Sequence, residues 1–260
     1  MHSRVTDDYE RMSLAGIRVV MEPAFWLGGA RTHAGTFYDY FDGILGFETE
    51  RAAQFGILHF VTLSMNPKEA NDRKLSKEVI DHMEANYLDR KGVVGVGEIG
   101  FDSTTDAEEE AIRLQLEVAR KKDLPVLIHT PHQRKAQGTR RSLDILKEMD
   151  YDPEKVIIDH NTEETTGMVR DAGCWAGHTV YPVTKLSPDR AANIVTKYGV
   201  EKMLINSSAD WGPSDVLSVP QTVRELRRRN FPEKEIASLV WQNPIDFFSQ
   251  SGRLDLGNLV

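Results

Sequence analysis

VVGVGEIGFD, residues 93–102, is the stretch from which the fold can be worked out. Val and Gly fill its first five positions, which is typical of a strand buried on both faces of a parallel sheet. Glu98 follows near the carboxyl end of this strand, with glycines close on both sides. A buried acid is costly unless it meets a partner, and a metal ion is one such partner. The stretch therefore predicts a buried strand that ends in a metal-binding acid.

Strand-like and helix-like segments alternate along the chain on both sides of this stretch. Seven strands are expected to start near residues 17, 57, 93, 124, 156, 174 and 203. The clearest helix between them, residues 105–122, is amphipathic and has a capping signal at its start. Alternation without a linker predicts one α/β domain over residues 1–260, a TIM-type (β/α)8 barrel with seven recognisable strands. A doubly wound open sheet is the alternative fold.

Composition narrows the class of protein. The length of 260 residues suits one barrel with a full core, and the net charge of −8 weighs against a nucleic-acid-binding surface. The single cysteine, Cys174, excludes a disulfide framework and indicates a reducing compartment. No apolar run reaches the roughly 18 residues of a membrane span, and no apolar signal region is found. We expect a cytoplasmic protein with a small-molecule substrate; a homo-oligomer is left open.

Three further polar residues stand at strand ends like Glu98. His129 and His160 each end an apolar run, and the intervals from Glu98 to His129 and from His129 to His160 are both 31 residues. A single histidine at the end of an apolar strand is more often a hydrogen-bonded core residue than a metal ligand. Together with an acid they form the ligand set of zinc, manganese or similar divalent metals, so one or two ions are expected. Asp210, at the end of the last strand, is expected to ligate the metal or to act as the catalytic base that accepts a proton from water.

Other residues near strand ends are candidates to line a substrate pocket. His132 and Arg134 follow His129 on one loop and are candidates to hold an anionic group, with ordinary loop polarity as the alternative. Glu22, His178 and Trp211 are expected to bind substrate from their own strand ends.

Two neighbours of the ligands, Asp159 and Thr130, are candidates to support them.

A formal dinucleotide fingerprint is also present in this region. Gly95, Gly97 and Gly100 match G-x-G-x-x-G, but that motif requires a helix that opens at the third glycine. Here residues 101–103 intervene, so the glycines are interpreted as permitting close backbone approach around Glu98. A nicotinamide-dependent enzyme is therefore disfavoured.

These motifs resemble those of the TatD-like metal-dependent hydrolases, a branch of the amidohydrolase-type TIM barrels. The resemblance runs from TDDYERM to NPIDFFSQSG. It implies metal-assisted hydrolysis of an ester, lactone, amide or phosphodiester bond. It also implies that Glu98 bridges two metals and that His129, His160 and Asp210 are further ligands. The segments SADWG, HNTEETT and HTPH differ from those of typical DNase members, so DNase activity is not expected.

The sequence departs from this family at its start. The family opens with a strand that ends in an H-x-H pair of metal ligands, whereas MHSRVTDDYE resembles the segment just after that motif. The start of the chain is therefore expected to lie further upstream, or the protein is a diverged member that lacks the first strand. In the second case a non-catalytic binding or scaffold protein is the alternative to a hydrolase. A metal-dependent lyase or decarboxylase on the same barrel is another, because a fold does not fix a reaction.

Overall fold

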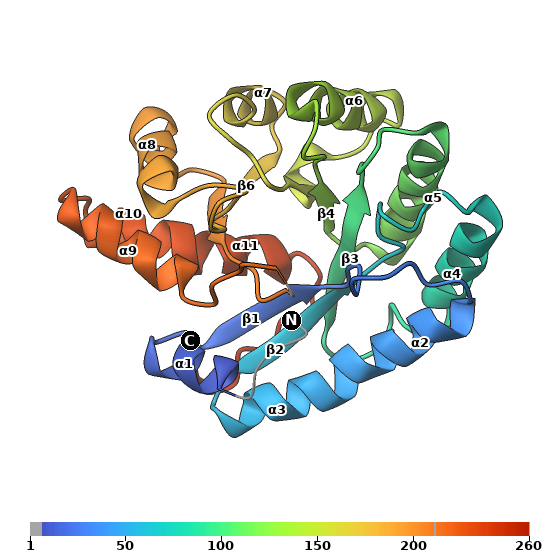
Figure 1. Ribbon diagram of the computed structural model, residues 1–260, viewed down its shortest axis with the longest axis horizontal. Helices are drawn as coiled ribbons and strands as arrows, with labels where there is room; N and C mark the ends of the chain where they lie inside the picture. The colour runs from blue at the N-terminus through green and yellow to red at the C-terminus, as the bar shows by residue number, and fades with distance from the viewer. Residues whose placement is uncertain (1–6, 211, 260) are drawn as a thin grey trace.

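Seven parallel strands form one curled sheet in the computed structural model, which describes residues 7–210 and 212–259 (Figure 1). The strands are β1 (Val19–Pro23), β2 (Leu58–Leu63), β3 (Val93–Gly100), β4 (Val126–His129), β5 (Val156–Ile158), β6 (Trp175–Thr179) and β7 (Met203–Asn206). Their order in the sheet is their order in the chain, and every neighbouring pair is parallel. Each strand starts within two residues of its expected position. The predicted TIM-type fold with seven strands is confirmed.

Helices alternate with the strands along the chain, and most of them surround the sheet on its outer side (Figure 1). The helices and helical turns are α1 (Asp8–Leu14), α2 (Ala34–Gly43), η1 (Ile44–Glu48), α3 (Thr49–Gln54), α4 (Arg73–Asn86), α5 (Asp106–Lys122), α6 (Lys135–Glu148), η2 (Pro153–Lys155), α7 (Thr166–Asp171), α8 (Pro188–Tyr198), α9 (Ser218–Arg228), α10 (Glu233–Ala237), η3 (Ser238–Gln242), α11 (Asn243–Ser249) and η4 (Gly257–Leu259). Within the described residues, no helix combines the length and the apolar character needed to cross a membrane.

Helix α5 shows how local sequence sets these boundaries. Thr105 accepts a hydrogen bond from the backbone N–H of Glu108, and the Glu108 side chain accepts one from the backbone N–H of Thr105, which is the predicted capping box. Acidic residues occupy the first turn and basic residues the last turn, which suits the helix dipole. The helix stops at Asp123, whose backbone is left-handed with φ 55°.

An apolar layer fills the inner face of the curled sheet. Strands β2 to β7 each contribute one large side chain to it: Phe60, Val94, Leu127, Ile157, Trp175 and Leu204. Phe247 and Phe248 of α11 join the same cluster, and the Phe247 ring packs edge-on against Trp175 with centroids 5.6 Å apart. Side chains two positions apart on a strand share a face, so His129 and Asp159 lie directly beyond Leu127 and Ile157. This layer therefore lies directly beneath the polar residues at the strand ends, and we call it the apolar floor.

Strands β1 and β7 are the two edges of the sheet as described. β1 pairs only with β2 and β7 only with β6 among residues 7–210 and 212–259, so no described strand joins them. Of the segment that resembles the stretch after an H-x-H motif, MHSRVTDDYE, residues 1–6 lie outside the described residues, and Asp8 begins α1.

The apolar floor predicts a large stability difference between two phenylalanine deletions. Phe247 is fully buried, so Phe247→Ala is expected to lower the free energy of unfolding by about 3–5 kcal/mol, through lost transfer energy and the cavity left behind. Phe47 is 65% exposed, so Phe47→Ala is the matched control, with an expected loss of about 0.5 kcal/mol or less. Urea denaturation of the three proteins measures both values. Equal losses for the two variants would show that α11 does not close the inner face.

Candidate metal centre

Glu98, His129 and His160 meet at the carboxyl ends of three neighbouring strands. Glu98 lies in β3, His129 ends β4, and His160 follows β5 by two residues. The Glu98 carboxylate oxygens lie 3.5 Å from His129 Nδ1 and 3.5 Å from His160 Nε2, and those two ring nitrogens are 2.9 Å apart. All three side chains are buried. The structure thus brings together three of the four residues that the sequence predicted as ligands; the fourth, Asp210, is not part of this cluster.

The donor atoms of this cluster fit a divalent metal. One carboxylate oxygen and one nitrogen from each histidine lie within 4.8 Å of one another. His129 presents Nδ1 to Glu98 and His160, and its other ring nitrogen, Nε2, is buried without a hydrogen-bond partner among the described residues, which is unusual for a buried polar atom. A mixed set of two imidazoles and one carboxylate is a common ligand set for zinc and related metals. Glu98, His129 and His160 would therefore hold such an ion.

Asp159 supports the cluster from β5. It lies 3.4 Å from His160 Nδ1, and Asn206 Nδ2 donates a 2.9 Å hydrogen bond to it. His160 Nδ1 is also 2.6 Å from the hydroxyl oxygen of Thr179. Gly177 makes room for the acid, because a Cβ at that position would lie 2.3 Å from Asp159 Oδ1. Carboxylates behind metal-binding imidazoles fix their orientation, which is the supporting role expected for Asp159.

Thr130, the other expected supporting residue, donates a 2.7 Å hydrogen bond to the backbone carbonyl of Asp159.

Burial sets the protonation of the cluster. It raises the pKa of Glu98 to about 7, with the positive charge of Lys185 opposing and the negative charge of Asp210 adding to the shift. Burial lowers the pKa of His129 to about 3 and that of His160 well below its usual range, and Lys185 adds to both effects. The two imidazoles are therefore neutral near pH 7, which is the form that binds metals.

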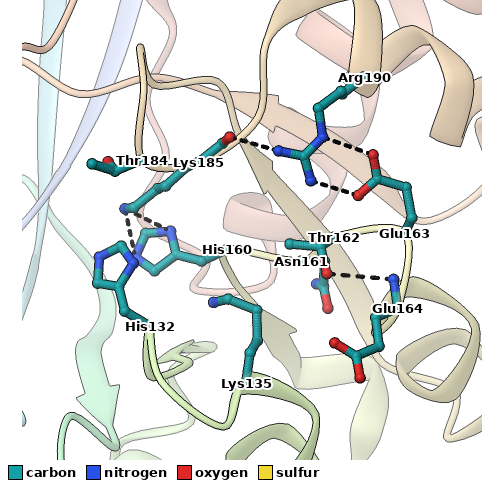
Figure 2. A pocket seen from close by; sticks show the side chains of 10 residues that line it. All are labelled: His132, Lys135, His160, Asn161, Thr162, Glu163, Glu164, Thr184, Lys185 and Arg190. Atoms are coloured by element: carbon teal, nitrogen blue, oxygen red, sulfur yellow. Dashed lines mark hydrogen bonds and ion pairs between the residues drawn. The ribbon is translucent and has the colours of Figure 1, made fainter.

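A cavity of about 400 Å³ opens beside His160. Its walls come from the loops after β4, β5 and β6 and from the start of α8 (Figure 2). Its lining residues are His132, Lys135, His160, Asn161, Thr162, Glu163, Glu164, Thr184, Lys185 and Arg190. Of the two histidines that the sequence predicted for a substrate pocket, His132 lines this cavity, and burial lowers its pKa to about 4.

Two lysines of this cavity were not predicted from the sequence. Lys185 Nζ lies 3.2 Å from both ring nitrogens of His160, and Lys135 Nζ lies 3.0 Å from the hydroxyl oxygen of Thr130. Both lysines follow strands in loop-like sequence, where a lysine ordinarily points into solvent. Their position is the one feature of the sequence that could have indicated them. Lys135 falls six residues after the end of β4, and Lys185 falls six residues after the end of β6.

The structure does not bring all the predicted pocket residues to this cavity. Arg134 caps α6 with a left-handed backbone and is absent from the cavity lining. Glu22 is buried with its carboxylate 2.7 Å from His59 Nε2. Because Met21 faces the inner apolar layer, Glu22 faces the opposite, helix side of β1. His178 is fully buried and lies 2.9 Å from the Thr166 hydroxyl of α7, also on the helix side.

Asp210 lies at the rim rather than in the ligand cluster. Its Oδ1 accepts hydrogen bonds from the Tyr181 hydroxyl and the Gly212 N–H, each 2.8 Å long. Its charge nevertheless acts on Glu98 and Lys185. The neighbouring predicted residue, Trp211, lies outside the described residues.

The buried position of His178 predicts a measurable pH dependence of stability. Burial lowers its pKa in the folded protein to about 4 from a usual 6.5, so the unfolded chain binds more protons between these values. Stability is therefore lost as pH falls from about 6.5 toward 4, by up to about 1.4 kcal/mol per pH unit. His178→Gln is expected to remove this part of the slope, measured by urea denaturation from pH 7 to 4.5. The exposed His33→Gln is the control, and identical slopes in all three proteins would contradict the assignment.

Comparison with known proteins places the chain in a family. A family model described as TatD related DNase matches residues 47–249. A metal-dependent hydrolase of Methanocaldococcus jannaschii, itself uncharacterized, is 28% identical over 245 residues, which cover 94% of this chain and 95% of that protein. The crystal structure of a TatD-like protein from Archaeoglobus fulgidus matches with a TM-score of 0.78 and 26% identity over 95% of each chain.

A more distant structure shares the fold. A lactonase from Listeria monocytogenes matches with a TM-score of 0.66 and 15% identity, over 94% of this chain and 84% of that one. At this identity the likeness concerns the fold alone. The family model covers most of the chain, and the three candidate metal ligands lie together at the strand ends. The chain therefore belongs to the TatD related DNase family, and it is an enzyme of the TatD-like metal-dependent hydrolase type.

Proposed function

We propose that this enzyme hydrolyses an ester, lactone, amide or phosphodiester bond of a small molecule, using a divalent metal such as zinc or manganese. The observation that carries the proposal is the buried cluster of Glu98, His129 and His160 beside an open cavity. Such a metal supplies Lewis acidity and lowers the pKa of a water ligand from about 15.7 to about 7. The cavity next to His160 leaves room for a substrate of limited size.

The residues around the cluster have separable roles in this proposal. Glu98, His129 and His160 bind the metal, and Asp159 orients His160. Asp210 is the general base: Tyr181 and Gly212 hold its Oδ1, and Oδ2 accepts no hydrogen bond among the described residues. A carboxylate fixed in this way is preorganised to accept a proton.

The cellular setting is proposed from the cysteine content and the net charge. Cys174 is buried as a free thiol, which is consistent with a reducing cytoplasm. The acidic net charge favours a small-molecule substrate over a nucleic acid.

Activity assays on stripped and reloaded protein test the function. Metal is removed with a chelator and zinc or manganese is added back, and a panel of esters, lactones, amides and phosphodiesters is then screened. The loaded protein is expected to hydrolyse at least one class. Asp210→Asn is expected to lower kcat by about 100-fold or more, because the amide keeps the shape but cannot accept the proton.

Exposed Asp81 on α4 provides the matched control, since Asp81→Asn makes the same chemical change outside the site. It should retain the full rate. A metal-loaded protein that cleaves none of the panel would support the non-catalytic binding protein instead. Full activity of Asp210→Asn would assign the base to another residue.

A further inference from the structure

We propose that Lys135 and Lys185 bind a negatively charged group of the substrate, a carboxylate or a phosphoryl group, beside the metal centre. The inference rests on the proposed function and names the substrate class for that site. Two features carry it: the position of both ammonium groups at one cavity, and the absence of carboxylates that would neutralise them.

Both lysines point into the same space. Lys135 enters from the first turn of α6 and Lys185 from the loop after β6, and both line the cavity with His132 and His160 (Figure 2). Lys185 Nζ lies 3.2 Å from each His160 ring nitrogen, so a group bound there is next to a proposed metal ligand. An anion held by these lysines would thus place an adjacent bond close to the metal.

Neither lysine is neutralised by direct contact with an acid. Among residues 7–210 and 212–259, no carboxylate oxygen lies within 4.0 Å of either ammonium nitrogen. The third cation of the cavity, Arg190, is different, because Glu163 holds it through two hydrogen bonds of 2.7 and 2.8 Å. The unneutralised positive charge is therefore concentrated on Lys135 and Lys185, at the end of the cavity nearest the metal centre.

The more distant acids do not cancel this charge once a metal is bound. Glu98, Asp159 and Asp210 all act on Lys185, but Glu98 and Asp159 belong to the metal centre and its support. The two lysines and a divalent ion together carry four positive charges. The three carboxylates carry three negative charges, so one positive charge remains in excess. Burial and the charge of Lys185 lower the pKa of Lys135 to about 8, as expected for two cations that face one space. An anion between them would relieve this repulsion.

Lysine is suited to this role by its chemistry. Its ammonium is a compact point charge with three donors, and it binds phosphate and carboxylate oxygens without requiring a fixed planar geometry. His132 and Arg134 are the residues that the sequence predicted to hold such a group. In the structure His132 and Lys135 line the cavity, whereas Arg134 is absent from its lining.

Calorimetric titration with simple anions tests the inference without requiring turnover. Inorganic phosphate and succinate are titrated into zinc-loaded protein, with succinamide as the uncharged analogue of succinate. We expect at least one anion to bind and succinamide not to bind. Lys135→Gln and Lys185→Gln should each weaken that binding about tenfold or more. Lys74→Gln, an exposed lysine of α4, makes the same charge change and should leave binding unaltered.

Further variants separate a charge effect from misfolding. Lys135→Arg and Lys185→Arg retain the charge and should recover most of the binding, and thermal melts report whether each variant is folded. Binding of phosphate alone would identify a phosphoryl group, and binding of succinate alone a carboxylate. The inference is overturned if neither anion binds, or if the glutamine variants bind as well as the parent protein.

The outcomes also distinguish this inference from the proposed hydrolysis. Anion binding that depends on the two lysines, without cleavage of any ester, lactone, amide or phosphodiester tested, would support the inference and contradict the proposed hydrolysis. Hydrolysis of an anionic substrate at the full rate by both glutamine variants would support the proposed hydrolysis and contradict the inference.

Discussion

The arrangement of this protein depends on one costly feature, the Glu98 carboxylate buried against two neutral imidazoles. Burial raises the pKa of Glu98 to about 7 and lowers that of His129 to about 3, so neither histidine offers a positive charge to the acid. A divalent metal resolves this conflict, because it needs deprotonated carboxylate and neutral imidazole together. The surrounding polar contacts, such as the hydrogen bond from Asn206 to Asp159, then serve to hold these ligands in place.

The sheet makes this arrangement possible through its regular pleat. Neighbouring parallel strands end at the same edge, so β3, β4 and β5 bring residues 31 apart in sequence within bonding reach of one ion. The same pleat places large apolar side chains two positions earlier on β4 and β5. Along β4 and β5, the apolar side chains that stabilise the fold thus come first, and the polar side chains of the site follow at the strand end.

This separation explains what the sequence could and could not predict. Apolar runs that end in an acid or a histidine predicted the strands and the convergence of Glu98, His129 and His160, because both depend on period and position alone. Glu22 and His178 were misplaced, since nearness to a strand end does not tell which face a side chain takes. Side chains alternate between the two faces along a strand, so Glu22 faces the helices once Met21 is known to face the inner layer. Lys135 and Lys185 lie in or beside loops, whose paths no periodicity predicts.

The most direct measurement of the central claim is anomalous X-ray diffraction from crystals grown with zinc or manganese. Data collected on both sides of the metal absorption edge locate the ion without assumptions about its ligands. The account predicts a peak about 2.0–2.2 Å from Glu98 and from one ring nitrogen each of His129 and His160. A fully loaded crystal with no peak within bonding distance of these three residues would contradict it.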